Sequence, residues 1–204
     1  MTEINRELAQ RVLKVVDAGL VGSLGQPKPG FMCVEAAICY ALGMPHGDDP
    51  KCILKSLRAF KIHLNDVKGW SSKAARAEGL RRLAIAQLGS DAIDEQQFVD
   101  RLADTARDWL RKAGETVGNA GLSYQQREML SSARKYSGFI DGSTFPVTAG
   151  SWVAYTAHHL SRLLASLKIQ PKDKTLSDCA EDVVQILVGM GAPGCQFLDL
   201  TEAA

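Results

Sequence analysis

The chain has 204 residues, a formal net charge of +1, and a composition of 46% hydrophobic and 23% charged residues. This balance excludes a disordered or fibrous chain, and the length suits a globular domain that buries most of its apolar side chains without metal or disulfide support. We therefore expect residues 1 to 204 to form a single domain.

Targeting and redox signals predict a cytoplasmic protein. The amino terminus mixes acidic and basic residues into an apolar pattern and lacks the features of a signal peptide. The longest nearly apolar stretch, residues 31 to 45, is shorter than the roughly 20 residues that span a membrane. Five cysteines without a CxxC pair are expected to be reduced thiols. We therefore expect no membrane partner, no metal and no cofactor.

Helical periodicity dominates the first quarter of the chain. Residues 4 to 20 show the pattern of an amphipathic helix, and a loop rich in glycine and proline follows over residues 22 to 30. Residues 31 to 43 are apolar around nearly the whole circumference of a helix, with Glu35 as the only charged side chain. We expect this helix at the centre of the domain.

The rest of the chain continues the helical pattern. Further helices are predicted over residues 50 to 64, 72 to 89, 94 to 114, 123 to 137, 151 to 168 and 176 to 190. The only credible strand material is at residues 139 to 150, where a turn or a minor hairpin is expected. The predicted class is all-α, a compact bundle of about eight helices, and stacked helical pairs are the alternative.

Glu35 and Cys33 are the first candidates for chemistry. A carboxylate on an apolar helix must find a partner or raise its pKa, and such groups are frequent at functional sites. Cys33 falls in the opening turn of the same helix, where the helix dipole favours a thiolate. A cysteine nucleophile also needs a base, for which the candidates are His63, His158 and His159.

The same residues have a structural interpretation. Cysteine is often buried, so Cys33 is then a core residue, and Glu35 forms an ion pair with Lys28 or with an arginine from another helix. Adjacent helical residues point about 100° apart, so His158 and His159 cannot easily bind one ion. No metal site is predicted.

Charge distribution supplies a second candidate site. Residues 51 to 89 hold nine basic and two acidic side chains, whereas acidic residues concentrate in 91 to 108 and 172 to 204. The basic part is therefore expected to meet something negative. The alternative is pairing with the acidic segments, within one chain or between copies of it.

A basic helix face carries this second candidate. Lys51, Lys55 and Arg58 lie on one face of the predicted helix, Lys61 lies at its edge, and Trp70 follows nearby. Such a face can contact nucleic-acid phosphates, and an exposed tryptophan can stack on a base.

These features are consistent with two functions. The first, which we expect, is a non-catalytic intracellular binding or assembly module, regulatory or scaffolding, whose charged helix faces engage a protein partner, another copy or nucleic acid. The second is a small cysteine-dependent helical enzyme centred on Cys33 and Glu35. The sequence contains no phosphate loop, dinucleotide fingerprint or zinc pattern.

Overall fold

The computed structural model describes residues 3 to 118, 121 to 141 and 145 to 202. Within these ranges the chain forms α-helices, two 3-10 helices and isolated β-bridges, so the all-α prediction is confirmed. The elements are α1 (Arg6–Val16), α2 (Val34–Ala41), α3 (Lys55–Asp66), α4 (Lys73–Ala86), η1 (Ser90–Ala92), α5 (Glu95–Val117), α6 (Tyr124–Asp141), α7 (Pro146–Ser166), α8 (Lys172–Gly189) and η2 (Pro193–Thr201).

The hairpin considered for residues 139 to 150 is not formed by the described part of that segment. Helix α6 continues to Asp141 and α7 begins at Pro146, while residues 142 to 144 lie outside the described residues. Proline suits the first turn of a helix because its missing N–H would have no partner there. This proline explains why α7 begins before residue 151, the predicted start.

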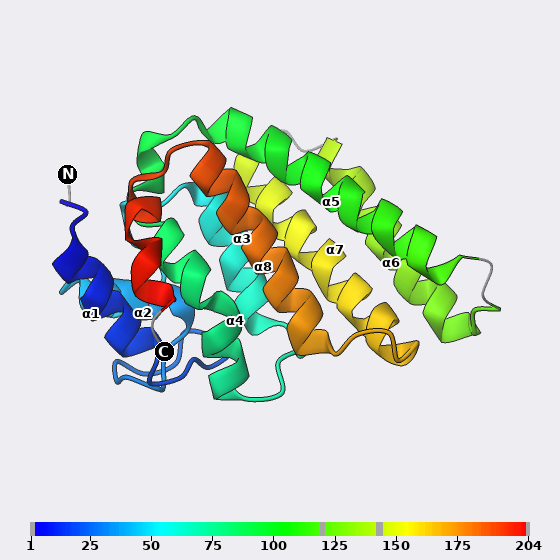
Figure 1. Cartoon of the computed structure of the whole chain (residues 1–204), viewed down its shortest axis with the longest axis horizontal. Helices are drawn as coiled ribbons and strands as arrows, with labels where there is room; N and C mark the ends of the chain where they lie inside the picture. The colour runs from blue at the N-terminus through cyan, green and yellow to red at the C-terminus, as the bar shows by residue number, and fades with distance from the viewer. Residues whose placement is uncertain (1–2, 119–120, 142–144, 203–204) are drawn as a thin grey trace.

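Helix α7 occupies the middle of the bundle and packs against α3, α5, α6 and α8 (Figure 1). Its buried face is built largely from small residues, including Ala149, Gly150, Ala154 and Ala157, which lets neighbouring helices come close. A Cβ atom on Gly150 would lie 2.0 Å from the Ser56 carbonyl oxygen of α3. The α3 and α7 backbones therefore touch at this crossing.

The central position that we predicted for residues 31 to 43 is wrong. Helix α2 spans only Val34–Ala41 and packs against α1, α3 and α4 at one end of the molecule (Figure 1). Its apolar circumference is nonetheless covered, since seven of its eight residues are buried. Burial could be predicted from composition, whereas the position depends on which helices surround α2.

A glycine-rich loop positions the start of α2. Gly25 has φ +73°, and a Cβ atom there would lie 2.0 Å from the Phe31 carbonyl oxygen, so only glycine fits. The Cys33 amide donates to the Leu24 carbonyl oxygen at 3.4 Å, and the Val21 amide donates to that of Met32 at 2.9 Å. These bonds fold the loop back onto the residues that open α2.

The carboxyl-terminal segment η2 returns to the amino-terminal end of the bundle. It packs against α4 and α1, and Figure 1 shows it beside α1. The Gly194 amide donates to the Leu88 carbonyl oxygen at 2.7 Å, and Phe197 and Leu198 are buried. In the described part of the chain, no helix has both the length and the apolar character that crossing a bilayer requires.

Candidate functional site

Glu35 of α2 and Lys61 of α3 form an ion pair inside the core. The Glu35 Oε1 and Lys61 Nζ atoms lie 2.6 Å apart, and neither side chain has any solvent exposure. Burial raises the pKa of Glu35 and lowers the pKa of Lys61, while their mutual attraction opposes both shifts. This pair joins α2 to α3.

The expected position of Lys61 at the edge of an exposed basic face is therefore wrong. Lys61 follows Leu57 by four residues and precedes Leu64 by three, which places it on the apolar stripe of α3. That spacing was visible in the sequence. The partner expected for Glu35 was Lys28 or an arginine from another helix, whereas the structure pairs Glu35 with Lys61.

Cys33 is the N-cap of α2, where its sulfur accepts a hydrogen bond from the Ala36 amide at 3.4 Å. Burial, which outweighs that hydrogen bond, and secondarily the charge of Glu35 raise the pKa of the Cys33 thiol to about 11. A thiol with this pKa stays protonated at neutral pH and is a poor nucleophile.

The candidate histidines are engaged elsewhere. The His63 ring lies 4.9 Å from that of Tyr155, and His159 stacks on Tyr136 with ring centroids 5.3 Å apart. The rings of His158 and His159 lie beside each other with centroids 5.4 Å apart. The structure thus brings Cys33 close to Glu35 but shows no contact between Cys33 and these histidines.

The basic face proposed from the sequence is not a single helix face, because Lys51 lies in a turn before α3 begins at Lys55, and its charges are largely neutralised within the chain. Lys51 forms an ion pair with Asp49, and Arg58 forms one with Asp48 at 2.7 Å. Lys55 is exposed and has no ion pair among the described residues. Internal pairing, the alternative considered from the sequence, therefore accounts for much of this face.

Other bases and Trp70 follow the same pattern. Arg81 pairs with Asp17 at 2.7 Å, and Arg82 pairs with Glu181 at 2.9 Å. The Trp70 indole N–H donates to the Leu64 carbonyl oxygen at 2.9 Å, and its ring covers α4 at a glycine. Trp70 is thus half-buried by packing and is not a free stacking surface.

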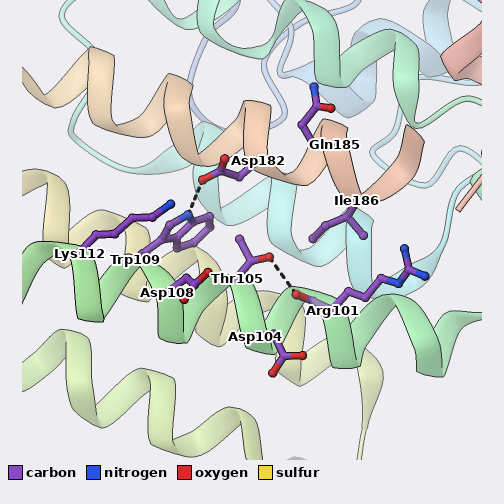
Figure 2. A pocket seen from close by; sticks show the side chains of 9 residues that line it. All are labelled: Arg101, Asp104, Thr105, Asp108, Trp109, Lys112, Asp182, Gln185 and Ile186. Atoms are coloured by element: carbon purple, nitrogen blue, oxygen red, sulfur yellow. Dashed lines mark hydrogen bonds between the residues drawn. The ribbon is translucent and has the colours of Figure 1, made fainter. Parts of the chain in front are cut away.

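The described surface has a groove between α5 and α8. It consists of two adjoining hollows of about 500 and 350 Å³ that share Trp109, Lys112 and Asp182, and we call it the α5–α8 groove. The first hollow is lined mainly by polar side chains of α5 and α8 (Figure 2). The second adds apolar side chains that include Leu164 and Ile169.

Helical periodicity explains the lining of the groove. Arg101, Thr105, Asp108 and Lys112 follow one another at intervals of four, three and four residues, so they form a stripe along α5. Beside this stripe, Trp109 is buried and donates its indole N–H to the Asp182 carboxylate at 2.7 Å. Figure 2 shows this bond bridging the two helices, with Lys112 next to the indole ring.

This groove was not predicted from the sequence. The polar stripe of α5 was visible as a pattern, but it had the spacing of any solvated helix face. Only the packing of α8 against α5 makes it one wall of a groove. Among the described residues, no group of three or more histidine, cysteine, aspartate or glutamate side chains is arranged to hold a metal ion.

No protein-family model, curated protein or solved structure matches this chain. The structure therefore assigns a fold class only, that of an all-α helical bundle. Because a fold alone does not imply a function, the function has to be inferred from the α5–α8 groove and from the state of the candidate residues.

Proposed function

We propose that the protein is a non-catalytic intracellular binding or assembly module, and that a protein partner binds in the α5–α8 groove. The groove itself carries this proposal. From Arg101 to Lys112 it follows about 16 Å of α5, at 1.5 Å per residue, and it continues to an apolar end at Ile169. An elongated groove with charged edges and apolar contacts suits a peptide segment of another protein.

The charges of the described chain favour a protein over a nucleic acid. Nucleic-acid affinity depends on basic side chains that neutralise phosphates. Lys51, Arg58 and Lys61 each have a carboxylate partner within the chain, which leaves Lys55 alone among the basic residues proposed for that face. Protonated, buried Cys33 in turn supports a non-catalytic role.

A peptide library displayed on phage and selected on the purified full chain tests the proposal. Selected peptides should bind with micromolar or lower Kd, and Ile169→Glu should weaken them by about tenfold, or about 1.4 kcal/mol. Phe145→Glu is the matched control, because both side chains are exposed and apolar but Phe145 lies outside the groove. Circular dichroism establishes that both variants fold.

Two results would overturn the proposal. One is the absence of any peptide that binds more weakly to Ile169→Glu than to wild type. The other is a gel shift with an oligonucleotide that Lys55→Glu abolishes, since this would favour the nucleic-acid partner of the charged α3 face.

A further inference from the structure

The carboxylates that line the α5–α8 groove all have partners within the chain. The partners are Arg107 for Asp104, Arg111 for Asp108, Gln170 and Lys174 for Asp178, and Trp109 for Asp182. None of these acids therefore needs a ligand to satisfy it. Arg107 and Lys174 offset the charges of Asp104 and Asp178, and Arg111 is shared between Asp108 and Glu115. Asp182 is hydrogen-bonded by the neutral Trp109 indole and keeps its charge.

The two cations in the lining are in the opposite situation. Arg101 and Lys112 are exposed, and the described residues provide no carboxylate partner for either. Arg101 extends over the last turn of α8, where its Nη1 atom would lie 3.3 Å from a Cβ atom on Gly189. The groove therefore presents two positive charges that the described residues leave unpaired.

The spacing of these cations constrains what can pair with both. They are eleven residues apart on one stripe of α5, or about 16 Å at 1.5 Å per residue. On a partner helix lying along the groove, residues eleven apart also return to the same face. In an extended segment about five residues cover this distance, and an odd number places the two side chains on opposite faces.

We infer that the occupant of the α5–α8 groove is an acidic amphipathic helix of a partner protein. Two of its carboxylates, three turns apart, pair with Arg101 and Lys112, and apolar side chains on the same face contact Trp109 and Ile169. This inference rests on the proposed function and adds the conformation and the charge of the bound segment.

Synthetic helical peptides test this inference by fluorescence polarisation at low and moderate salt. The first peptide carries two glutamates eleven residues apart and leucines on the same face, placed to reach Trp109 between the glutamates and Ile169 beyond the glutamate that pairs with Lys112. The second replaces both glutamates with glutamine, and the third moves one glutamate to the opposite face. We expect the first peptide to bind about tenfold or more tightly than the other two, and more weakly as salt rises.

Reversing the two charges distinguishes specific ion pairs with Arg101 and Lys112 from general electrostatic attraction. The double variant Arg101→Glu and Lys112→Glu should lose the glutamate peptide and bind a peptide with lysines at the same two positions. Lys14→Glu is a control, because Lys14 is exposed on α1, away from the groove.

The outcomes distinguish this inference from the function on which it rests. Equal affinity of the glutamate and glutamine peptides, or no rescue by the lysine peptide, overturns the acidic helix. If library peptides still bind in an Ile169-dependent manner, the proposed function stands without it. If neither the designed nor the library peptides bind, both fail.

Discussion

Glu35 and Lys61 are charged side chains without contact to solvent, and their energetics depend on each other. Removing an ion from water costs several kcal/mol even after relaxation, so each charge is tolerated only because the other lies beside it. Their environment also explains the state of Cys33, whose thiol is kept protonated by burial and by the charge of Glu35.

Removing one member of the pair should destabilise the protein strongly. We expect Lys61→Met to lower the free energy of unfolding by about 3 to 5 kcal/mol, because it leaves Glu35 buried without a counter-charge. The double variant Glu35→Leu and Lys61→Met should recover most of this loss. Urea denaturation measures both, and Glu7→Ala, in an exposed pair with Arg11, should cost no more than about 1 kcal/mol. A similar cost for Lys61→Met and Glu7→Ala would show that the buried pair is not coupled.

His158 should make stability depend on pH. Burial, followed by the charges of His159, Arg162 and Lys172, lowers the pKa of His158 from 6.5 to about 4. Between these values the unfolded chain binds a proton that the folded chain does not, so stability is full above pH 6.5 and falls as the pH drops towards 4. Denaturation midpoints in urea across this range should decline less steeply for His158→Gln than for wild type. Parallel pH profiles for the two proteins would contradict this assignment.

At the scale of the elements, the backbones of α7 and α3 touch where the two helices cross. Gly150 provides this contact because hydrogen is the only side chain that fits between the two backbones. Gly138 also lies within a helix, α6, but no atom would contact a Cβ atom there. The two glycines differ in their surroundings and not in their helical conformation.

Alanine substitution should therefore have opposite effects at these glycines. Gly150→Ala should lower the free energy of unfolding by about 1 to 3 kcal/mol or more, because the new methyl group forces α3 and α7 apart. Gly138→Ala should raise it by about 0.5 to 1 kcal/mol through helix propensity. Thermal and chemical denaturation compare the two, and stabilisation by Gly150→Ala would mean that the helices cross less closely than described.

Across the whole molecule, arginines of α4 connect the two ends of the described chain. The Arg81 guanidinium donates to the Asp17 carboxylate at 2.7 and 3.1 Å and to the Thr201 carbonyl oxygen at 2.6 Å. Arg82 similarly joins Glu181 and the Thr201 hydroxyl group. The basic residues of α4 thus hold η2 in place.

Loss of this connection should loosen η2 without unfolding the bundle. We expect Arg81→Ala to speed amide hydrogen exchange in residues 193 to 202 by about tenfold or more, because charge-assisted hydrogen bonds contribute about 1.5 to 3 kcal/mol. Exchange within α7 should change much less. Mass spectrometry of peptic fragments measures both regions, with Lys14→Ala as the control, and equal acceleration in η2 and α7 would indicate global destabilisation instead.

The helices themselves could be predicted from local patterns. The segment predicted over residues 94 to 114 is α5, and the Asp94 side chain caps it by accepting from the Gln97 amide at 2.6 Å. Helix α8 begins at Lys172, earlier than residue 176, its predicted start; Pro171 is its N-cap, and the Thr175 amide donates to the Pro171 carbonyl oxygen at 3.1 Å.

The candidate site depended on neighbours that a local pattern does not identify. Lys61 has a helical spacing that places it among leucines, yet its partner Glu35 lies on another helix. Arg101 and Lys112 belong to an ordinary solvated stripe until α8 packs beside it. Apolar periodicity, glycines and caps determine helices because their hydrogen bonds join residues four apart. Long-range packing decided which charges are buried, which are paired and which face a groove, because these depend on residues far apart in the chain.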